Sequence, residues 1–129
     1  MAHEFTTRVY YEDTDLAGIV YYANYLRFIE RARSEWVRDL GIDQTRLKED
    51  EGVVFAVRRV EADYLSPARF DDLLTVTTTV ERATPARLIL LQELRRDETL
   101  LFSARVMLVA VGERGVPVRL PVALRHTFA

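Results

Sequence analysis

The densest group of polar residues in the first third of the chain is the run Glu12, Asp13, Thr14 and Asp15. Ala17 and Gly18 follow it, and a glycine lets a ligand approach the backbone closely. A helical apolar pattern begins further on, at Tyr22. The first N–H groups of a helix are free to bind an anion or a polarised carbonyl oxygen. A carboxylate beside such donors has the two parts that acyl transfer needs, a base or nucleophile and an oxyanion site.

The same acidic run has a structural alternative, because Asp and Thr are favoured helix caps. Negative charge near a helix N-terminus is stabilised by roughly 0.3–1 kcal/mol. Asp15 lies too far before Tyr22 to be a simple N-cap, which favours the chemical role for it. Asp13 would point to the opposite side if strand geometry continued, so we expect it to face solvent or to form a turn. No third ligand lies nearby, so no metal site is expected.

The composition limits the classes of protein that could carry this cluster. The chain has 129 residues, of which 49% are hydrophobic and 29% charged, and its net charge is -2. These values predict one globular domain over residues 1–129 and exclude a disordered chain and a nucleic-acid binder that works by bulk charge. The absence of cysteine excludes thiolate nucleophiles, disulfides and zinc-thiolate sites. We see neither a signal peptide nor a segment suited to membrane insertion, so we expect a cytoplasmic protein.

The elements that must position the cluster are a strand before it and a long helix after it. Residues 4–12 are rich in Thr, Val and Tyr and predict a strand. Over residues 22–40 apolar side chains recur in steps of three and four, which predicts an amphipathic helix that Gly41 ends. A short second helix is expected at residues 45–51.

After the helices the apolar pattern changes to alternation, which predicts strands. Four follow: VVFAVRRVEADYL, LLTVTTTVERA, RLILLQELRR and TLLFSARVMLVAVG, the last two as a hairpin. LPVALRHTF would form a short terminal helix with Pro121 at its first position. One long helix must bury its apolar side on the sheet, so we predict an α+β fold, a curved antiparallel sheet wrapped around one long central helix. The open edges of such a sheet favour edge-to-edge dimerisation.

The stretch YYEDTDLAGIVYYANYLRFIERAR closely resembles the active-site segment of the hotdog-fold acyl-CoA thioesterases. Within that family it is similar to the 4-hydroxybenzoyl-CoA thioesterase branch and to the small bacterial thioesterases associated with the Tol–Pal system. The resemblance continues through FAVRRVEADYLSPARFDD and, more loosely, through the later strands. It implies a hotdog fold over the whole chain and an enzyme that hydrolyses acyl-CoA to a free acid and coenzyme A.

The resemblance also implies roles for three residues of the first motif. Asp15 matches the family's essential carboxylate, which acts as a nucleophile or as a general base on water, and Gly18 matches the turn glycine. Tyr22 matches the aromatic residue at the start of the hotdog helix, whose backbone N–H is expected to hold the thioester carbonyl oxygen. The Tol–Pal-associated relatives commonly carry His at this position, so Tyr22 agrees with the hydroxybenzoyl branch and speaks against a His-assisted step.

Several helix residues have both a structural and a substrate-binding interpretation. Asn24, the only asparagine, could hydrogen-bond near the thioester or serve the first turn of the helix. Glu30 and Arg33 could form a buried helix-to-sheet ion pair or a solvated pair, and we favour a structural role for both. Three residues of the apolar face could line an acyl pocket, although such residues are more often core: Tyr25, Ile29 and Trp36.

Coenzyme A carries a 3′-phosphate and a pyrophosphate, and arginine suits both anions. The candidates for these phosphates are Arg58, Arg59, Arg69, Arg82 and Arg87. Of these, Arg82 and Arg87 lie near where the hydroxybenzoyl branch places basic phosphate contacts. His3 and His126 have no nearby Ser or Cys that would complete a triad, so we expect structural roles for both.

Two other functions fit the same fold. A hydratase or dehydratase of acyl thioesters would pair a His with a carboxylate, and the central segment has no His. A non-catalytic acyl-CoA-binding module would not need the intact DTDLAG motif with Asp15. We therefore expect an acyl-CoA thioesterase without a cofactor, since coenzyme A is part of its substrate. The resemblance further implies a homodimer with the active site at its seam, and a tetramer of two such dimers.

Overall fold

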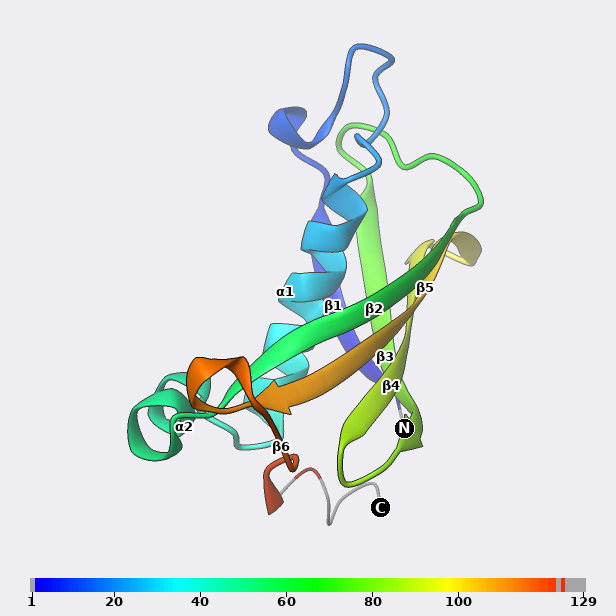
Figure 1. Ribbon diagram of the computed structural model, residues 1–129. Helices are drawn as coiled ribbons and strands as arrows, with labels where there is room; N and C mark the ends of the chain where they lie inside the picture. The colour runs from blue at the N-terminus through cyan, green and yellow to red at the C-terminus, as the bar shows by residue number, and fades with distance from the viewer. Residues whose placement is uncertain (1, 123, 125–129) are drawn as a thin grey trace.

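The computed structural model describes residues 2–122 and 124 (Figure 1). Its first half holds β1 (His3–Arg8), a 3-10 turn (Tyr11–Asp13), α1 (Asn24–Asp39) and α2 (Gln44–Glu51). Its second half holds β2 (Val54–Tyr64), β3 (Leu73–Ala83), β4 (Arg87–Arg96), β5 (Thr99–Val111), a 3-10 turn (Glu113–Gly115) and β6 (Pro117–Val118). The predicted order of a strand, one long helix and four long strands is confirmed. No helix in the described part of the chain is long and apolar enough to cross a membrane.

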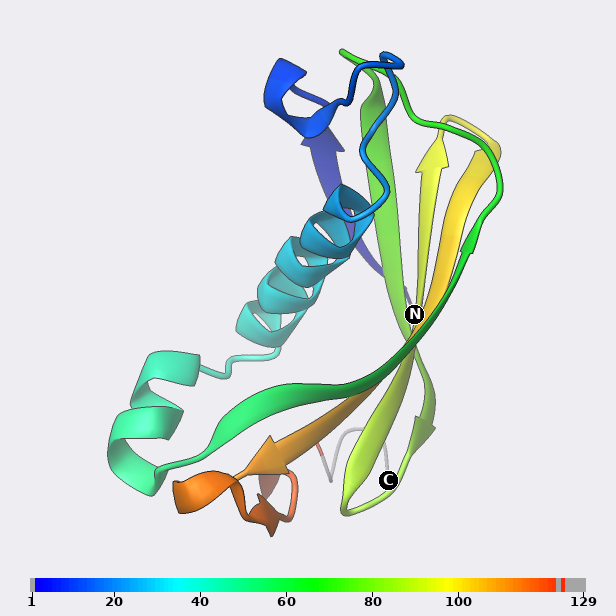
Figure 2. The ribbon, with the colours of Figure 1, turned by 45° about the horizontal axis from the view of Figure 1, so that its top comes forward.

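The strands form one antiparallel sheet in the order β1-β3-β4-β5-β2, and β6 pairs with β5. The register shifts once in each of the pairs β2–β5, β3–β4 and β4–β5. Such irregularities increase the local twist of a sheet and let it bend. Figure 2 shows the result, a strongly curved sheet with α1 lying on its concave side. The predicted α+β architecture, a curved antiparallel sheet around one long central helix, is confirmed.

The hydrophobic core lies between α1 and the concave face of the sheet. The buried side chains of α1 include Tyr25, Phe28, Ile29, Ala32, Trp36 and Val37. The inner positions of the sheet face them with residues such as Leu74, Leu90 and Phe102, each 0% exposed. Buried and less buried positions alternate along β3 and β4, as expected for strands with one face in the core. Ile29 and Trp36 therefore belong to the core.

A polar link crosses this core from α1 to β4. Gln92 is 0% exposed, and its amide nitrogen donates to the Ile29 carbonyl and to the Thr78 hydroxyl, each at 3.0 Å. Its carbonyl oxygen accepts a hydrogen bond from Arg33 Nη1, also at 3.0 Å. Burial lowers the pKa of the Arg33 guanidinium, and the charge of Glu30 raises it again in part. Arg33 thus joins the helix to the sheet, but its partner there is a neutral amide instead of a carboxylate.

Two element boundaries and one short strand differ from the predictions. β1 ends at Arg8 and not at residue 12, because the Tyr10 N–H bonds to the Asp13 carboxylate at 2.8 Å and the chain turns there. α1 begins at Asn24 and not at Tyr22. The short strand β6 was not predicted, and most of the predicted terminal helix lies outside the described residues.

β1 and β2 are the two edges of the sheet. The exposed apolar side chains of β2 are Val54, Val57, Val60 and Tyr64. An edge strand presents unpaired N–H and C=O groups, and an apolar edge strand is suited to pairing with another strand. The predicted dimerisation through a sheet edge therefore has a fitting surface along β2.

Candidate active site

Asp15 lies at the start of a tight turn between β1 and α1. Its carbonyl accepts the Gly18 N–H at 3.0 Å, and its own N–H donates to the Ile19 carbonyl at 2.9 Å. Gly18 has a φ of 79°, a left-handed conformation that residues with a side chain rarely adopt. One carboxylate oxygen of Asp15 accepts the Ala17 N–H at 2.9 Å. The Asp15 side chain is exposed to solvent, and the bond from the Ala17 N–H orients it.

Hydrogen bonds at the base of this turn fix it to the start of α1. Thr14 and Val20 form a β-bridge. Next to it, the Asp13 carbonyl accepts the Tyr21 N–H at 3.0 Å and the Asn24 side-chain amide at 2.9 Å. Asn24 is 9% exposed, so of its two predicted roles the structural one, at the first turn of the helix, is observed. Asp13 forms a turn as predicted, but it is buried and does not face solvent.

The segment between β2 and β3 holds the Asp15 turn from the other side. Its Ala68 carbonyl accepts the Val20 N–H at 2.8 Å, and Arg69 forms a β-bridge with Ile19. The Ala68 N–H donates to the Tyr25 hydroxyl at 3.0 Å. Because Ala68 is 0% exposed, these two bonds replace the water that its peptide groups have lost. Tyr25 thereby supports the turn from within the core.

Asp72 anchors the same segment to β4. One of its carboxylate oxygens accepts the Arg69 N–H and Arg96 Nη1, both at 2.8 Å. Partial burial raises the pKa of Asp72, but these hydrogen bonds and the charges of Arg96 and Arg69 together outweigh it, so the pKa lies below its usual value. Asp72 is thus a charged anchor that is strongest when ionised.

Tyr22 lies in the turn just before α1 and is 63% exposed. The Tyr21 carbonyl accepts the Asn24 N–H at 2.8 Å, and the Tyr22 carbonyl accepts the Tyr64 hydroxyl at 3.0 Å. No acceptor among the described residues bonds to the Tyr22 N–H. The N–H predicted as an oxyanion donor therefore belongs to the entry turn of the helix, directly after the residue that bonds to the Asp13 carbonyl.

An aromatic cluster packs behind this entry turn. Tyr25 is 4% exposed and stacks on Phe102, with ring centroids 4.9 Å apart. Tyr64 meets the rings of Tyr22, Tyr25 and Phe102 edge-on, at centroid distances of 6.2, 5.4 and 5.0 Å. Burial raises the pKa of the Tyr25 hydroxyl, so that hydroxyl stays protonated at neutral pH. Tyr25 is therefore a core residue whose hydroxyl accepts a hydrogen bond from the Ala68 N–H.

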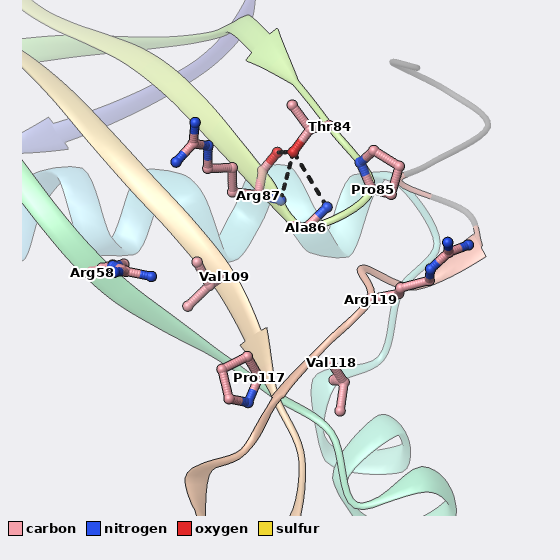
Figure 3. A pocket seen from close by; sticks show the side chains of 9 residues that line it. All are labelled: Arg58, Thr84, Pro85, Ala86, Arg87, Val109, Pro117, Val118 and Arg119. Atoms are coloured by element: carbon pink, nitrogen blue, oxygen red, sulfur yellow. Dashed lines mark hydrogen bonds between the residues drawn. The ribbon is translucent and has the colours of Figure 1, made fainter.

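The predicted phosphate-binding arginines do not all come together. Arg58 and Arg87 line one pocket of about 630 Å³, with Arg119 as a third arginine (Figure 3). None of the described residues that line it is acidic. Arg59 instead pairs with a glutamate of its own strand at 2.7 Å, and Arg82 is exposed outside the pocket. No pattern in the sequence had singled out Arg119, because it follows a strand of only two residues.

The segment between β1 and α1 and the turn between β3 and β4 lie at opposite ends of the sheet (Figures 1 and 2). The β3 residue Leu73 pairs with Arg8, just before the Asp15 turn, whereas Ala83 ends β3 beside the pocket. β3 has 11 residues, and a strand rises about 3.3 Å per residue, so roughly 33 Å separate its two ends. A site that used both regions of the same chain would have to span that length.

His3 lies apart from the Asp15 region. His3 Nε2 is 2.8 Å from the Asp39 carboxylate at the end of α1, which agrees with the structural role predicted for it. His126 lies outside the described residues. Across residues 2–122 and 124, no three His, Asp or Glu side chains gather in a way that could hold a metal ion.

This chain is similar in sequence to known proteins. The family model of the thioesterase superfamily matches residues 17–103. An acyl-CoA thioesterase YbgC from Haemophilus influenzae is 41% identical over 126 residues, which cover 96% of this chain and 92% of that protein. The chain belongs to the thioesterase superfamily. The family resemblance that the first motif indicated is therefore confirmed.

Solved structures of thioesterases share the fold. A probable thioesterase from Bartonella henselae matches with a TM-score of 0.90 at 42% identity, over 94% of this thioesterase and 100% of that chain. A 4-hydroxybenzoyl CoA thioesterase mutant in complex with 4-hydroxybenzoyl CoA matches with a TM-score of 0.92 over 99% of both chains. Its identity is 21%, so this second likeness concerns the fold alone. The predicted hotdog fold is confirmed.

Proposed function

We propose that this thioesterase hydrolyses acyl-CoA to a free acid and coenzyme A, with Asp15 as the reacting carboxylate and the Tyr22 N–H as the oxyanion donor. The observation that carries the proposal is that residues next to both groups are joined through one carbonyl, that of Asp13. The Asp13 carbonyl ties the base of the Asp15 turn to Tyr21 and Asn24, which flank Tyr22. A carboxylate and a free N–H are thereby held in fixed relation, as acyl transfer requires.

Two routes are compatible with this arrangement. In the first, a carboxylate oxygen of Asp15 attacks the thioester carbon, the carbon–sulfur bond breaks, and water then hydrolyses the mixed anhydride. In the second, Asp15 accepts a proton from a water molecule as the water oxygen attacks the same carbon. Negative charge develops on the carbonyl oxygen in both routes, and the Tyr22 N–H would stabilise it. The coenzyme A thiolate leaves and takes up a proton from solvent.

The arginine pocket around Arg58, Arg87 and Arg119 is the region best suited to the phosphates of coenzyme A, because no acidic residue of the described chain lines it. The pantetheine arm has a backbone about as long as that of four residues, so it spans roughly 14 Å when extended. That is less than half of the roughly 33 Å between the ends of β3. The pantetheine arm alone therefore does not bridge the Asp15 end of β3 and the end beside the pocket in the same chain.

A second copy of the chain would resolve this mismatch. Pairing of two β2 edges about a two-fold axis is antiparallel, so it brings the Asp15 end of one copy toward the arginine end of the other. The exposed apolar residues Val57, Val60 and Tyr64 would become buried in that seam. A homodimer is thus part of the proposal, and a tetramer of two such dimers is its extension. A monomer in light scattering at micromolar concentration contradicts it.

The activity is tested with short aliphatic, long aliphatic and aromatic acyl-CoA substrates, by following the release of free thiol. We expect turnover with at least one of them and a loss of most of it in Asp15→Asn. Glu12→Gln is the matched control, because Glu12 is an exposed carboxylate of the same segment. The absence of turnover on the whole panel, or full activity in a folded Asp15→Asn variant, contradicts the proposal.

The arginine pocket is tested by the double variant Arg58→Ala/Arg87→Ala. We expect a higher KM for acyl-CoA and an unchanged KM for the acyl-pantetheine substrate, which lacks the nucleotide phosphates. Arg82→Ala is the control, because Arg82 is exposed but lies outside the pocket. An equal change for both substrates shows that the pocket does not hold the phosphates.

A further inference from the structure

Tyr64 links the sheet to the entry turn of α1. It is the last residue of β2, and its hydroxyl donates to the Tyr22 carbonyl at 3.0 Å. Its ring rests against Phe102 and Tyr25, with centroid distances of 5.0 and 5.4 Å. The ring is therefore held by the core cluster, while its hydroxyl reaches the backbone that carries the proposed oxyanion donor.

The two peptide groups that flank Tyr22 are each held by one hydrogen bond. The Tyr21 carbonyl shares a peptide plane with the Tyr22 N–H, and it accepts the Asn24 N–H at 2.8 Å. No cis peptide bond occurs in the described residues, so this N–H points to the side opposite to that carbonyl. The next peptide carries the Tyr22 carbonyl, which Tyr64 holds. With both carbonyls bonded, the backbone at Tyr22 cannot rotate without the loss of one bond.

We propose that Tyr64 is a positioning residue that keeps the Tyr22 N–H aimed at the reacting carbonyl oxygen. This inference rests on the proposed function, because it takes the Tyr22 N–H as the oxyanion donor. In the entry turn, Tyr22 is 63% exposed and precedes the first residue of α1, and the bond to its carbonyl comes from the Tyr64 hydroxyl. The bond from Tyr64 ties this turn to the rigid sheet across 42 positions of sequence.

The hydroxyl of Tyr64 stays a donor under ordinary conditions. Burial raises its pKa, and the neighbouring hydroxyls of Tyr22 and Tyr25 raise it further. The bond to the Tyr22 carbonyl is therefore present throughout the neutral pH range. A positioning bond of this kind affects the transition state, where charge develops on the oxygen, more than it affects substrate binding.

The test is Tyr64→Phe, which keeps the ring and removes only the hydroxyl. We expect kcat to fall roughly tenfold with KM unchanged, because a misaimed oxyanion donor loses part of its usual effect of about 10²–10³. Tyr11→Phe is the matched control, since Tyr11 is 82% exposed and, among the described residues, its ring pairs with the Phe70 ring and with none of the Tyr64 cluster. A higher KM with the same kcat would mean that the hydroxyl binds substrate directly, and this overturns the proposal.

A second readout does not depend on activity. The chain has six tyrosines, so protein labelled with ¹⁵N-tyrosine gives six backbone amide signals, and the Tyr22→Phe variant identifies the one from Tyr22. We expect Tyr64→Phe to shift and broaden that signal, and Tyr11→Phe to leave it in place. An unchanged signal overturns the positioning role.

The two proposals fail in distinguishable ways. If Asp15→Asn removes turnover while Tyr64→Phe leaves kcat within twofold, the proposed function stands and the positioning role is refuted. If Asp15→Asn keeps full turnover, the proposed site is wrong whatever Tyr64→Phe does. A lower kcat and a shifted Tyr22 signal in the Tyr64→Phe variant, together with an inactive Asp15→Asn, support both.

Discussion

Replacing Gln92 with leucine should be among the most destabilising changes of a single side chain in this thioesterase. Leucine has a similar volume, but it removes every hydrogen bond that the Gln92 amide makes at the centre of the sheet. Arg33 Nη1 and the Thr78 hydroxyl then lose their partner, and the guanidinium of Arg33 is left partly buried. The perturbation therefore tests whether the link between α1 and β4 is an important part of the fold.

The size of the effect follows from the three bonds. A hydrogen bond from a charged donor contributes roughly 1.5–3 kcal/mol, and each bond between neutral groups about 1 kcal/mol. The Ile29 carbonyl lies within α1 and keeps its place in the helix, so the loss of the bond to this carbonyl costs the least. Burial of the extra apolar surface of leucine offsets about 1 kcal/mol. We expect a net loss of about 3 kcal/mol, which lowers the Tm of a chain of this size by roughly 10 °C.

The assay is urea unfolding at one fixed protein concentration, because association of folded chains adds to the measured stability. Gln44→Leu is the matched control, since Gln44 is exposed and should change the stability by less than about 0.5 kcal/mol. A double-mutant cycle with Arg33→Leu isolates the charged bond. If Gln92→Leu costs less than about 1 kcal/mol, or if the two changes are additive, the reasoning about this link is wrong.

Three further predictions concern the supports of the Asp15 turn. Tyr25→Phe leaves the buried Ala68 N–H without an acceptor, so we expect a loss of about 1–3 kcal/mol in urea unfolding. Asn24→Asp exchanges a donor for a carboxylate oxygen that faces a carbonyl, so kcat should fall severalfold and the Tm should drop by a few degrees. Asp72 has a lowered pKa, so its anchoring is present above about pH 4, the pKa of an unfolded Asp, and is lost as the pH falls through the lower folded value. Asp72→Asn should therefore destabilise the protein at neutral pH and reduce the loss of stability in acid, both measured by urea unfolding at a series of pH values.

The elements that the sequence predicts well are those with a long repeating pattern. α1 and the strands β2 to β5 each repeat their apolar spacing over ten or more residues, so the period stands out from single exceptions. The Asp15 turn was also predictable, because two acidic residues and a glycine interrupt the pattern. The end of β1 was not, since one hydrogen bond from the Asp13 carboxylate to the Tyr10 N–H overrides the strand pattern locally.

The contacts that support the site could not be predicted, because they join positions far apart in the sequence. Gln92 reads as one more polar residue of a strand until Arg33, 59 positions away, is seen to bond to it. The bond between Tyr64 and Tyr22 spans 42 positions. The sequence singled out Arg33 and Tyr22, but no local pattern indicates which distant side chain bonds to each of them.

The direct hydrogen bonds at the base of the Asp15 turn are mostly between main-chain groups. The bonds at its base come from the backbone of Asp13, Val20 and Ala68, and its outermost residue, Leu16, has no part in them and is fully exposed. Substitution at Leu16 can therefore alter the exposed surface of the turn and leave the carboxylate in place. The tip of the turn is thus free to vary over generations, while the backbone that sets the place of Asp15 stays the same.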